Sequence, residues 1–237
     1  MAIRRLLVKQ PSIRSVHHKP RPHRQSVALT LYLRQASRLS NPDPRRVSIV
    51  EGDVFFPGTL RAAMHGADVV YANLTGDMAR QARAMVDAMH ATGVTRLIFI
   101  SSMGIYGEVP GERYRAILAP YRDSAEMIEQ SDLDYTVLRP GWFTRDPEVR
   151  YQITQKGEPF KGHDVSLNGL SELIVQLATV QGLHVRCSLG VSDEWGSMLP
   201  RRYRDSLRQV SICFTLAGIR RCASIAASEL VRSLASR

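Results

Sequence analysis

Long apolar runs are missing from this sequence of 237 residues. No stretch approaches the roughly 18 to 20 uninterrupted apolar residues of a membrane-spanning helix, and the first residues lack the apolar core and small-residue cleavage site of a secretory signal. Cysteine is scarce, since Cys187, Cys213 and Cys222 are odd in number and have neither metal-ligand nor CxxC spacing. These absences predict a soluble, cytoplasmic protein with reduced thiols and no membrane partner.

Glycine is absent from the chain before Gly52. Residues 9–26 instead contain Pro11, Pro20 and Pro22 among basic residues, and proline at these places prevents an ordinary helix. The histidines of this segment have no carboxylates nearby, so we expect no metal site. We expect residues 1–27 to be an irregular basic segment, although Leu6-Leu7-Val8 offers a short strand.

The formal net charge of +10 is concentrated at the two ends of the chain. Residues 1–46 hold eleven Lys/Arg and one acid, residues 47–196 hold thirteen and nineteen, and residues 197–237 hold eight and two. The central part is therefore acidic. Basic ends attract phosphate polymers without sequence preference. Because the chain has no base-reading motif, we expect no specific nucleic-acid partner.

Short apolar runs alternate with helical segments from about Ala28 to Val191. Such a rhythm predicts βαβ units on a parallel sheet, with strands buried on both faces. The expected strands are 28–33, 47–50, 68–72, 96–100, 134–138 and 184–191. The expected helices are 58–65, 77–92, 121–131 and 168–180.

These patterns divide the chain into three parts. Residues 28–196 form the expected α/β domain, and residues 197–237 form a basic tail. The apolar clusters of that tail, with arginines between them, are compatible with amphipathic helices that pack on the domain, with an unstructured tail, or with a helix on a membrane surface.

Ligands of a doubly wound sheet bind at the carboxyl ends of its strands, so the residues that follow each apolar run are the most informative. Arg34 and Arg38 follow the first run, where a basic side chain can pair with the 2′-phosphate of NADP. Asp53 and Val54 follow the second run, where a carboxylate can accept a hydrogen bond from the adenine amino group. The alternative for Arg34 is a solvated loop arginine.

The next three strand ends carry small residues, hydroxyls and a turn. Asn73 and Leu74 let the backbone approach a ribose, while Ser101 and Ser102 place hydroxyls at the centre of the cleft. The turn Pro140-Gly141-Trp142 is suited to closing over a nicotinamide ring. The ordered set is more specific than any of its members.

These residues resemble the atypical, extended short-chain dehydrogenase/reductase superfamily, in particular small NAD(P)-binding members related to flavin reductases and nucleoside-diphosphate-sugar epimerases. The resemblance covers residues 28–191 and rests on LYLRQASRL, VEGDV, ADVVYANLTG, AMVDAMHATGVTRLIFISSMGIYG and SDLDYTVLRPGWF. It implies a Rossmann-like doubly wound parallel sheet, with NADP as cofactor and NAD as a second possibility. It also implies cofactor contacts from Arg34, Arg38, Asp53, Val54, Asn73, Leu74, Ser101, Pro140, Gly141 and Trp142.

The chain departs from that family at the phosphate site. Family members begin with a strand, a GxxGxxG-type turn and a helix, whose backbone amides bind the pyrophosphate. No glycine precedes Gly52 here, so we expect the first βα unit to be lacking or distorted. The composition changes abruptly at about Ser26. This leads to the hypothesis of an altered reading frame or a degraded gene, with a genuine N-terminal replacement as the alternative.

The second departure concerns catalysis. Classical members use Tyr-xxx-Lys, in which the lysine lowers the pKa of the tyrosine so that the phenol can exchange a proton with the substrate. Tyr121 stands at the matching place, but Ala125 replaces the lysine. Ser102 and Tyr121 are the catalytic candidates, and Tyr106 and Tyr114 are alternatives. An exposed tyrosine at a helix start is the simpler interpretation of Tyr121.

The sequence thus predicts an NADP-linked oxidoreductase of low or absent activity. The alternative is a non-catalytic dinucleotide-sensing or interaction module, which the missing lysine favours. The expected partners are a dinucleotide and a small-molecule substrate of unknown identity, and a homodimer is left open.

Overall fold

The computed structural model describes residues 2–8, 27–35, 44–45 and 47–193, with backbone positions alone for residues 2–8 and 27. An eight-stranded sheet has the order β3-β2-β1-β4-β5-β6-β10-β8, and a second sheet pairs β7 with β9. The strands are β1 (Ala2–Val8), β2 (Val27–Leu33), β3 (Val47–Glu51), β4 (Val69–Asn73), β5 (Arg96–Ile100), β6 (Asp134–Pro140), β7 (Trp142–Thr144), β8 (Gln152–Gln155), β9 (Asp164–Ser166) and β10 (Cys187–Ser192). The helices are α1 (Pro57–Met64), α2 (Met78–Thr92), α3 (Ala119–Glu129) and α4 (Leu167–Thr179).

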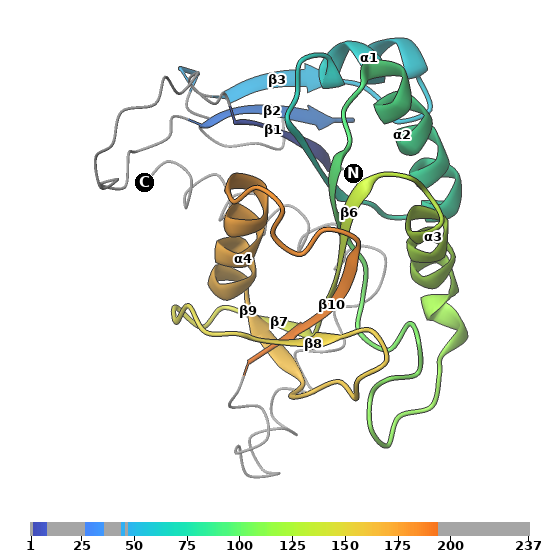
Figure 1. Ribbon diagram of the computed structural model, residues 1–237, viewed down its shortest axis with the longest axis vertical. Helices are drawn as coiled ribbons and strands as arrows, with labels where there is room; N and C mark the ends of the chain where they lie inside the picture. The colour runs from blue at the N-terminus through green and yellow to red at the C-terminus, as the bar shows by residue number, and fades with distance from the viewer. Residues whose placement is uncertain (1, 9–26, 36–43, 46, 194–237) are drawn as a thin grey trace.

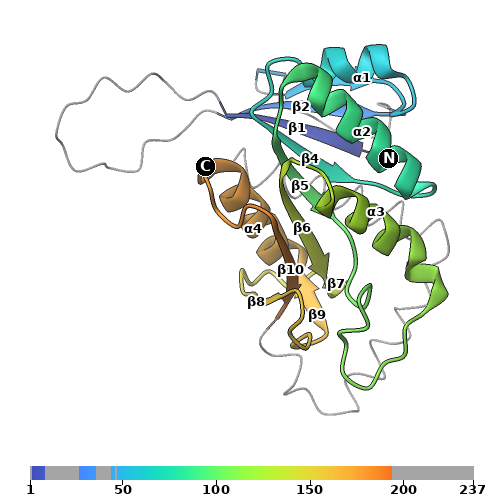
Figure 2. The same cartoon turned by 45° about the vertical axis from the view of Figure 1, so that its right-hand side comes forward.

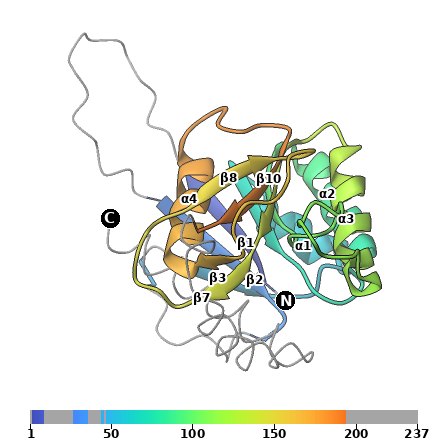
Figure 3. The ribbon, with the colours of Figure 1, turned by 90° about the horizontal axis from the view of Figure 1, so that it is seen from below.

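Helices cover both faces of the large sheet. Helices α1, α2 and α3 lie on one face and α4 on the other (Figures 1 and 3). Neighbouring strand residues point to opposite faces, so Leu97 and Phe99 of β5 pack under α1–α3, whereas Ile98 and Ile100 pack under α4. Both faces of β5 are therefore buried, which explains its uninterrupted apolar sequence.

The predicted α/β fold with a parallel sheet is confirmed. Strand pairs β2/β3, β4/β5, β5/β6 and β6/β10 are parallel, and the expected strands and helices between residues 28 and 191 are all present. Short strands β7, β8 and β9 were not predicted, because three or four residues give too little alternation to detect.

Strand β1 lies inside the sheet, between β2 and β4, but runs in the opposite direction from both. It is antiparallel to β2 and to β4, with Ala2 opposite Leu33 and Asn73, and Val8 opposite Val27 (Figure 2). Val8 therefore lies at the amino ends of β2 and β4, the edge away from the expected ligand site. The carboxyl end of β1 is therefore not at the edge where a Rossmann-type glycine turn binds the pyrophosphate.

The helix that normally follows the first strand is also absent from the described residues. Ile49 of β3 pairs with Leu31 of β2, on the face where α4 is the only described helix, and its side chain is 39% exposed. The reversed direction of β1 agrees with the expected distortion of the first βα unit. Arg38 and the tail 197–237 lie outside the described residues, and no described helix is long and apolar enough to span a bilayer.

Candidate functional site

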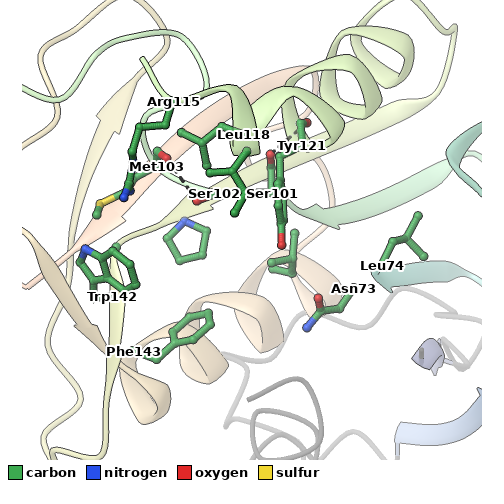
Figure 4. A pocket seen from close by; sticks show the side chains of 14 residues that line it. Asn73, Leu74, Ser101, Ser102, Met103, Arg115, Leu118, Tyr121, Trp142 and Phe143 are labelled. Atoms are coloured by element: carbon green, nitrogen blue, oxygen red, sulfur yellow. Dashed lines mark hydrogen bonds between the residues drawn. The ribbon is translucent and has the colours of Figure 1, made fainter. Parts of the chain in front are cut away.

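A cavity of about 180 Å³ opens at the carboxyl ends of β4, β5 and β6. Figure 4 shows its lining side chains, which come from these strand ends and from the start of α3. Eight residues that the sequence singled out line it: Asn73, Leu74, Ser101, Ser102, Tyr121, Pro140, Gly141 and Trp142. The expectation that ligands bind at the carboxyl ends of the strands therefore identified residues that lie up to 69 positions apart in the chain but meet at one cavity.

The loop after β4 is fixed by its own hydrogen bonds. Strand β4 is buried from Val69 to Ala72, and Asn73 is its first partly exposed residue. Gly76 adopts a φ of +90°, which favours glycine, and Gln81 Nε2 donates to the Thr75 carbonyl over 3.0 Å. This loop holds Asn73 and Leu74 at one end of the cavity.

Ser101 links the end of β5 to the start of α3. Its hydroxyl donates to the Tyr121 carbonyl over 3.3 Å, and Ser124 Oγ donates to the same carbonyl over 3.0 Å. Ser102, which is less buried, donates to the Met103 carbonyl over 3.1 Å. Both cavity hydroxyls use their protons on the backbone, so toward a ligand they are available as acceptors.

Tyr121 is half-buried and lines the cavity near the start of α3. Burial raises the pKa of its phenol, and its hydroxyl makes no hydrogen bond with a described residue. Ala125, at the position of the family's lysine, is fully buried in the core under α3. Tyr121 is therefore a neutral phenol at ordinary pH, without the cation that would make it a stronger acid.

The two alternative tyrosines are not among the residues that line this cavity. The Tyr106 hydroxyl donates to Glu129 over 2.6 Å, and burial, followed by that carboxylate, strongly raises the pKa of the phenol. Tyr114 is 41% exposed and lies under the Arg122 guanidinium at 5.3 Å. Tyr121 is therefore the tyrosine that the fold places at the cavity.

The turn from Pro140 to Trp142 depends on a close backbone approach. A Cβ atom on Gly141 would lie 2.3 Å from the His163 carbonyl oxygen, a distance that real side chains do not reach. The Gly141 N–H donates to the Val191 carbonyl and the Trp142 N–H to that of His163, each over 2.9 Å. The Trp142 and His163 rings stack at 6.1 Å. The glycine thus fixes the aromatic wall of the cavity.

A buried ion pair behind the cavity was not foreseen from the sequence. The Arg139 side chain is fully buried, and its Nη1 lies 2.5 Å from Oε1 of Glu108, which is 6% exposed. Glu108 also accepts from the Gly104 N–H over 3.0 Å and the Tyr106 N–H over 2.9 Å. This carboxylate holds the loop that carries Ser102 and Met103. Because Glu108 and Arg139 lie 31 positions apart in the chain, no local pattern could reveal the pair.

A second group of predicted residues lies at the ends of β2 and β3. Arg34 Nε is 3.9 Å from Asp53 Oδ2, and the Arg34 side chain is 48% exposed. The Tyr32 hydroxyl donates to the Asp53 carbonyl over 2.7 Å and fixes this loop. Val54 packs in the core at 1% exposure, so a ligand contact from this residue would have to use its backbone.

Six further cavity residues were missed by sequence reasoning. They are Ile100, Met103, Arg115, Ile117, Leu118 and Phe143. Arg115, Ile117 and Leu118 belong to the segment before α3, where no strand end marks them.

Among the described residues, no group of three or more His, Cys, Asp or Glu side chains is placed to hold a metal ion.

Comparison with known proteins places this geometry in a family. The model of the NAD(P)H-binding family matches residues 22–181. A Rossmann-fold NAD(P)-binding protein from Shigella flexneri is 39% identical, with a TM-score of 0.62 over 69% of this chain and 79% of the other. A short-chain dehydrogenase/reductase from Veillonella parvula, crystallised with NADP, is 28% identical, with a TM-score of 0.62 over 69% of this chain and 82% of the other.

A curated relative is an NAD(P)H azoreductase from Xenophilus azovorans, which is 26% identical over 129 residues. The match covers 53% of this chain and 44% of that protein, so the chain spans less than half the length of this relative. The resemblance to short-chain dehydrogenases/reductases is confirmed, and the chain belongs to the NAD(P)H-binding family of Rossmann-fold proteins.

Proposed function

We propose that this protein is an NADP-linked oxidoreductase whose nicotinamide site is the cavity at the ends of β4, β5 and β6. The observation that carries the proposal is the convergence of Asn73, Ser102, Tyr121 and Trp142 on one cavity. An exposed arginine, Arg34, lies farther along the sheet at the end of β2. The NADP complex of the Veillonella relative supports the same choice of cofactor.

The adenosine end of the cofactor would lie over β2 and β3. Arg34 is a described cation at this edge, and a guanidinium can bind a 2′-phosphate through two parallel hydrogen bonds. Its distance of 3.9 Å from Asp53 is long for an ion pair, and the side chain is half exposed. Arg34 can therefore turn toward a phosphate while Asp53 receives the adenine amino group. Arg38 would supply a second positive charge.

The nicotinamide end would lie against Pro140 and the backbone of the turn at Gly141. The cavity volume of about 180 Å³ is below the roughly 300 to 1,000 Å³ of typical ligand pockets, so it is too small for a whole dinucleotide. Bound NADPH supplies a hydride. The rigid turn at Gly141 would hold the ring edge, and the apolar wall would exclude water from the transfer.

Proton delivery would fall to Tyr121, the phenol at the cavity that has no hydrogen-bond partner among the described residues. Ser102 Oγ can accept a hydrogen bond from the substrate but donates its own proton to the Met103 carbonyl. Burial raises the pKa of Tyr121, and Ala125 supplies no cation, so proton transfer would be slow. We accordingly expect low turnover.

A second function, a non-catalytic dinucleotide-sensing module, is favoured by the same observation at Ala125. Full burial of that residue leaves no room for a lysine beside Tyr121. Cofactor binding without turnover would distinguish this function from the first. The three-part division of the chain, a cytoplasmic location and a homodimer stay predictions.

Calorimetric titration with NADPH and NADH tests the proposal. NADPH should bind more tightly, and Arg34→Asp should reduce the preference, because it replaces the cation by an acid that repels the 2′-phosphate. Arg83→Asp on α2 is the matched control, since Arg83 is exposed and forms no ion pair with a described residue. Equal binding of the two cofactors to the unmodified chain would contradict NADP selection. Turnover is then measured with quinone, flavin and sugar-nucleotide substrates, and its complete absence would favour the sensing module.

A further inference from the structure

Arg115 stands at one end of a cavity that is otherwise uncharged. Among the described residues that line the cavity, Arg115 is the only charged one, and no carboxylate is among them. The Arg115 side chain is exposed and forms no ion pair with a described carboxylate. Figure 4 shows it reaching past Met103 toward Trp142. The guanidinium is therefore available to a ligand.

The walls next to Arg115 are apolar and aromatic. Met103, Ile117, Leu118, Trp142 and Phe143 line the cavity, and Ile117 is 70% exposed at its mouth. Large exposed apolar side chains next to a pocket are typical of surfaces that a ligand covers. A flat apolar ring would pack against Trp142, and a cation nearby would complement a negative group on that ring.

The position of Arg115 separates it from the proposed cofactor contacts. Asn73 and Leu74 lie at the opposite end of the cavity in Figure 4, and Arg34 lies two strands beyond β4 in the sheet. A cofactor that extends from Arg34 past Asn73 to Pro140 would leave the Arg115 end for a second molecule. This geometry argues that Arg115 binds substrate rather than a cofactor phosphate.

We infer that the substrate is a small aromatic anion, whose ring packs on Trp142 and whose carboxylate or sulfonate is bound by Arg115. That the bound anion is a substrate rests on the proposed function. The binding site itself can be tested without cofactor or turnover. Arg115 acts here by binding and orienting the molecule, with no part in proton or hydride transfer.

The probes are 2-naphthoate and 2-naphthamide, which share one ring system and differ in charge. Binding is followed by the fluorescence of Trp142 in a Trp195→Phe background, because Trp142 and Trp195 are the chain's two tryptophans. Naphthoate should bind about fivefold more tightly than naphthamide, the size expected for one partly exposed ion pair. Arg115→Gln should abolish this difference, whereas Arg115→Lys should keep most of it.

Arg113→Gln is the matched control, because Arg113 is exposed, lies on the same segment and does not line the cavity. It should leave the fivefold preference unchanged. Equal binding of the two probes to the parent chain, no binding of either probe, or a preference that survives Arg115→Gln would overturn the inference.

NADPH titration of Arg115→Gln separates this inference from the proposed function. Cofactor affinity should stay within about twofold of the parent value, since Arg115 is placed on the substrate. A larger loss would assign Arg115 to the cofactor and overturn the inference. If the chain binds no NADPH but discriminates the two probes through Arg115, the proposed function fails while the anion site stands.

Discussion

The ion pair between Glu108 and Arg139 should be the most sensitive polar interaction of the fold. Arg139 is fully buried and Glu108 is 6% exposed, so neither charge is solvated if its partner is removed. Glu108→Gln keeps the side-chain shape but removes the negative charge, which leaves a buried guanidinium without compensation. Loss of one partner of a buried pair typically costs about 3–5 kcal/mol. That is a large share of the roughly 5–15 kcal/mol by which domains are stable.

The remaining contacts of Arg139 and Glu108 indicate where in this range of about 3–5 kcal/mol the loss for Glu108→Gln should fall. Arg139 has two other contacts, the Ser188 carbonyl at 3.3 Å and the Tyr106 ring at 5.3 Å, and its Nε has no hydrogen-bond partner among the described residues. A glutamine at position 108 can still accept from one of the N–H groups of Gly104 and Tyr106. The loss in free energy of unfolding should therefore be about 3 kcal/mol rather than about 5 kcal/mol.

Urea unfolding of a double-mutant cycle measures the interaction. With a slope of about 2 kcal/mol/M, Glu108→Gln should lower the midpoint by about 1.5 M. Arg139→Met leaves a carboxylate that keeps two backbone N–H donors, so it should cost less. The double variant should be more stable than the sum of the single losses by at least about 2 kcal/mol, because a buried pair replaced as a unit is often tolerated. A loss below about 1 kcal/mol for Glu108→Gln, or additive single losses, would refute the reasoning.

Three further predictions follow from the site and the fold. Gly141→Ala should lower the free energy of unfolding in urea by about 1–3 kcal/mol and weaken NADPH binding, because the new Cβ meets the His163 carbonyl. The control Gly58→Ala, where a Cβ has open space, should cost nothing. The free energy of unfolding should fall as pH rises above about 10, since the unfolded state loses the Tyr106 proton there while the pKa of the folded phenol is raised. Tyr106→Phe should flatten this fall, and identical slopes of stability against pH for the parent and the variant would refute the assignment. Replacing the segment upstream of Val27 by a strand and glycine-rich turn should tighten NADPH binding by about two to four orders of magnitude, because it restores two or more charge-assisted hydrogen bonds to the pyrophosphate. Low-micromolar NADPH binding by the unmodified chain would contradict this prediction.

Local sequence determined the scaffold of the domain and half of its site. Runs such as VVYA in β4 and RLIFI in β5 are apolar without alternation, and only strands covered on both faces bury every side chain of such a run. Parallel strands end at one edge, so Asn73, Ser101 and Pro140 could be predicted to meet without knowledge of any contact.

Contacts between distant residues had to come from the tertiary structure. The direction of β1 has no local signal, because a strand pairs in either sense through the same backbone groups and its neighbours in the sheet decide which. Arg115 reaches the cavity because the segment before α3 folds over the end of β5, and Glu108 meets Arg139 across 31 residues. Periodicity and strand ends specify which residues are buried and where strands stop. The partners of a buried charge, and the side chains that complete a cavity, depend on packing between segments that are far apart in the chain.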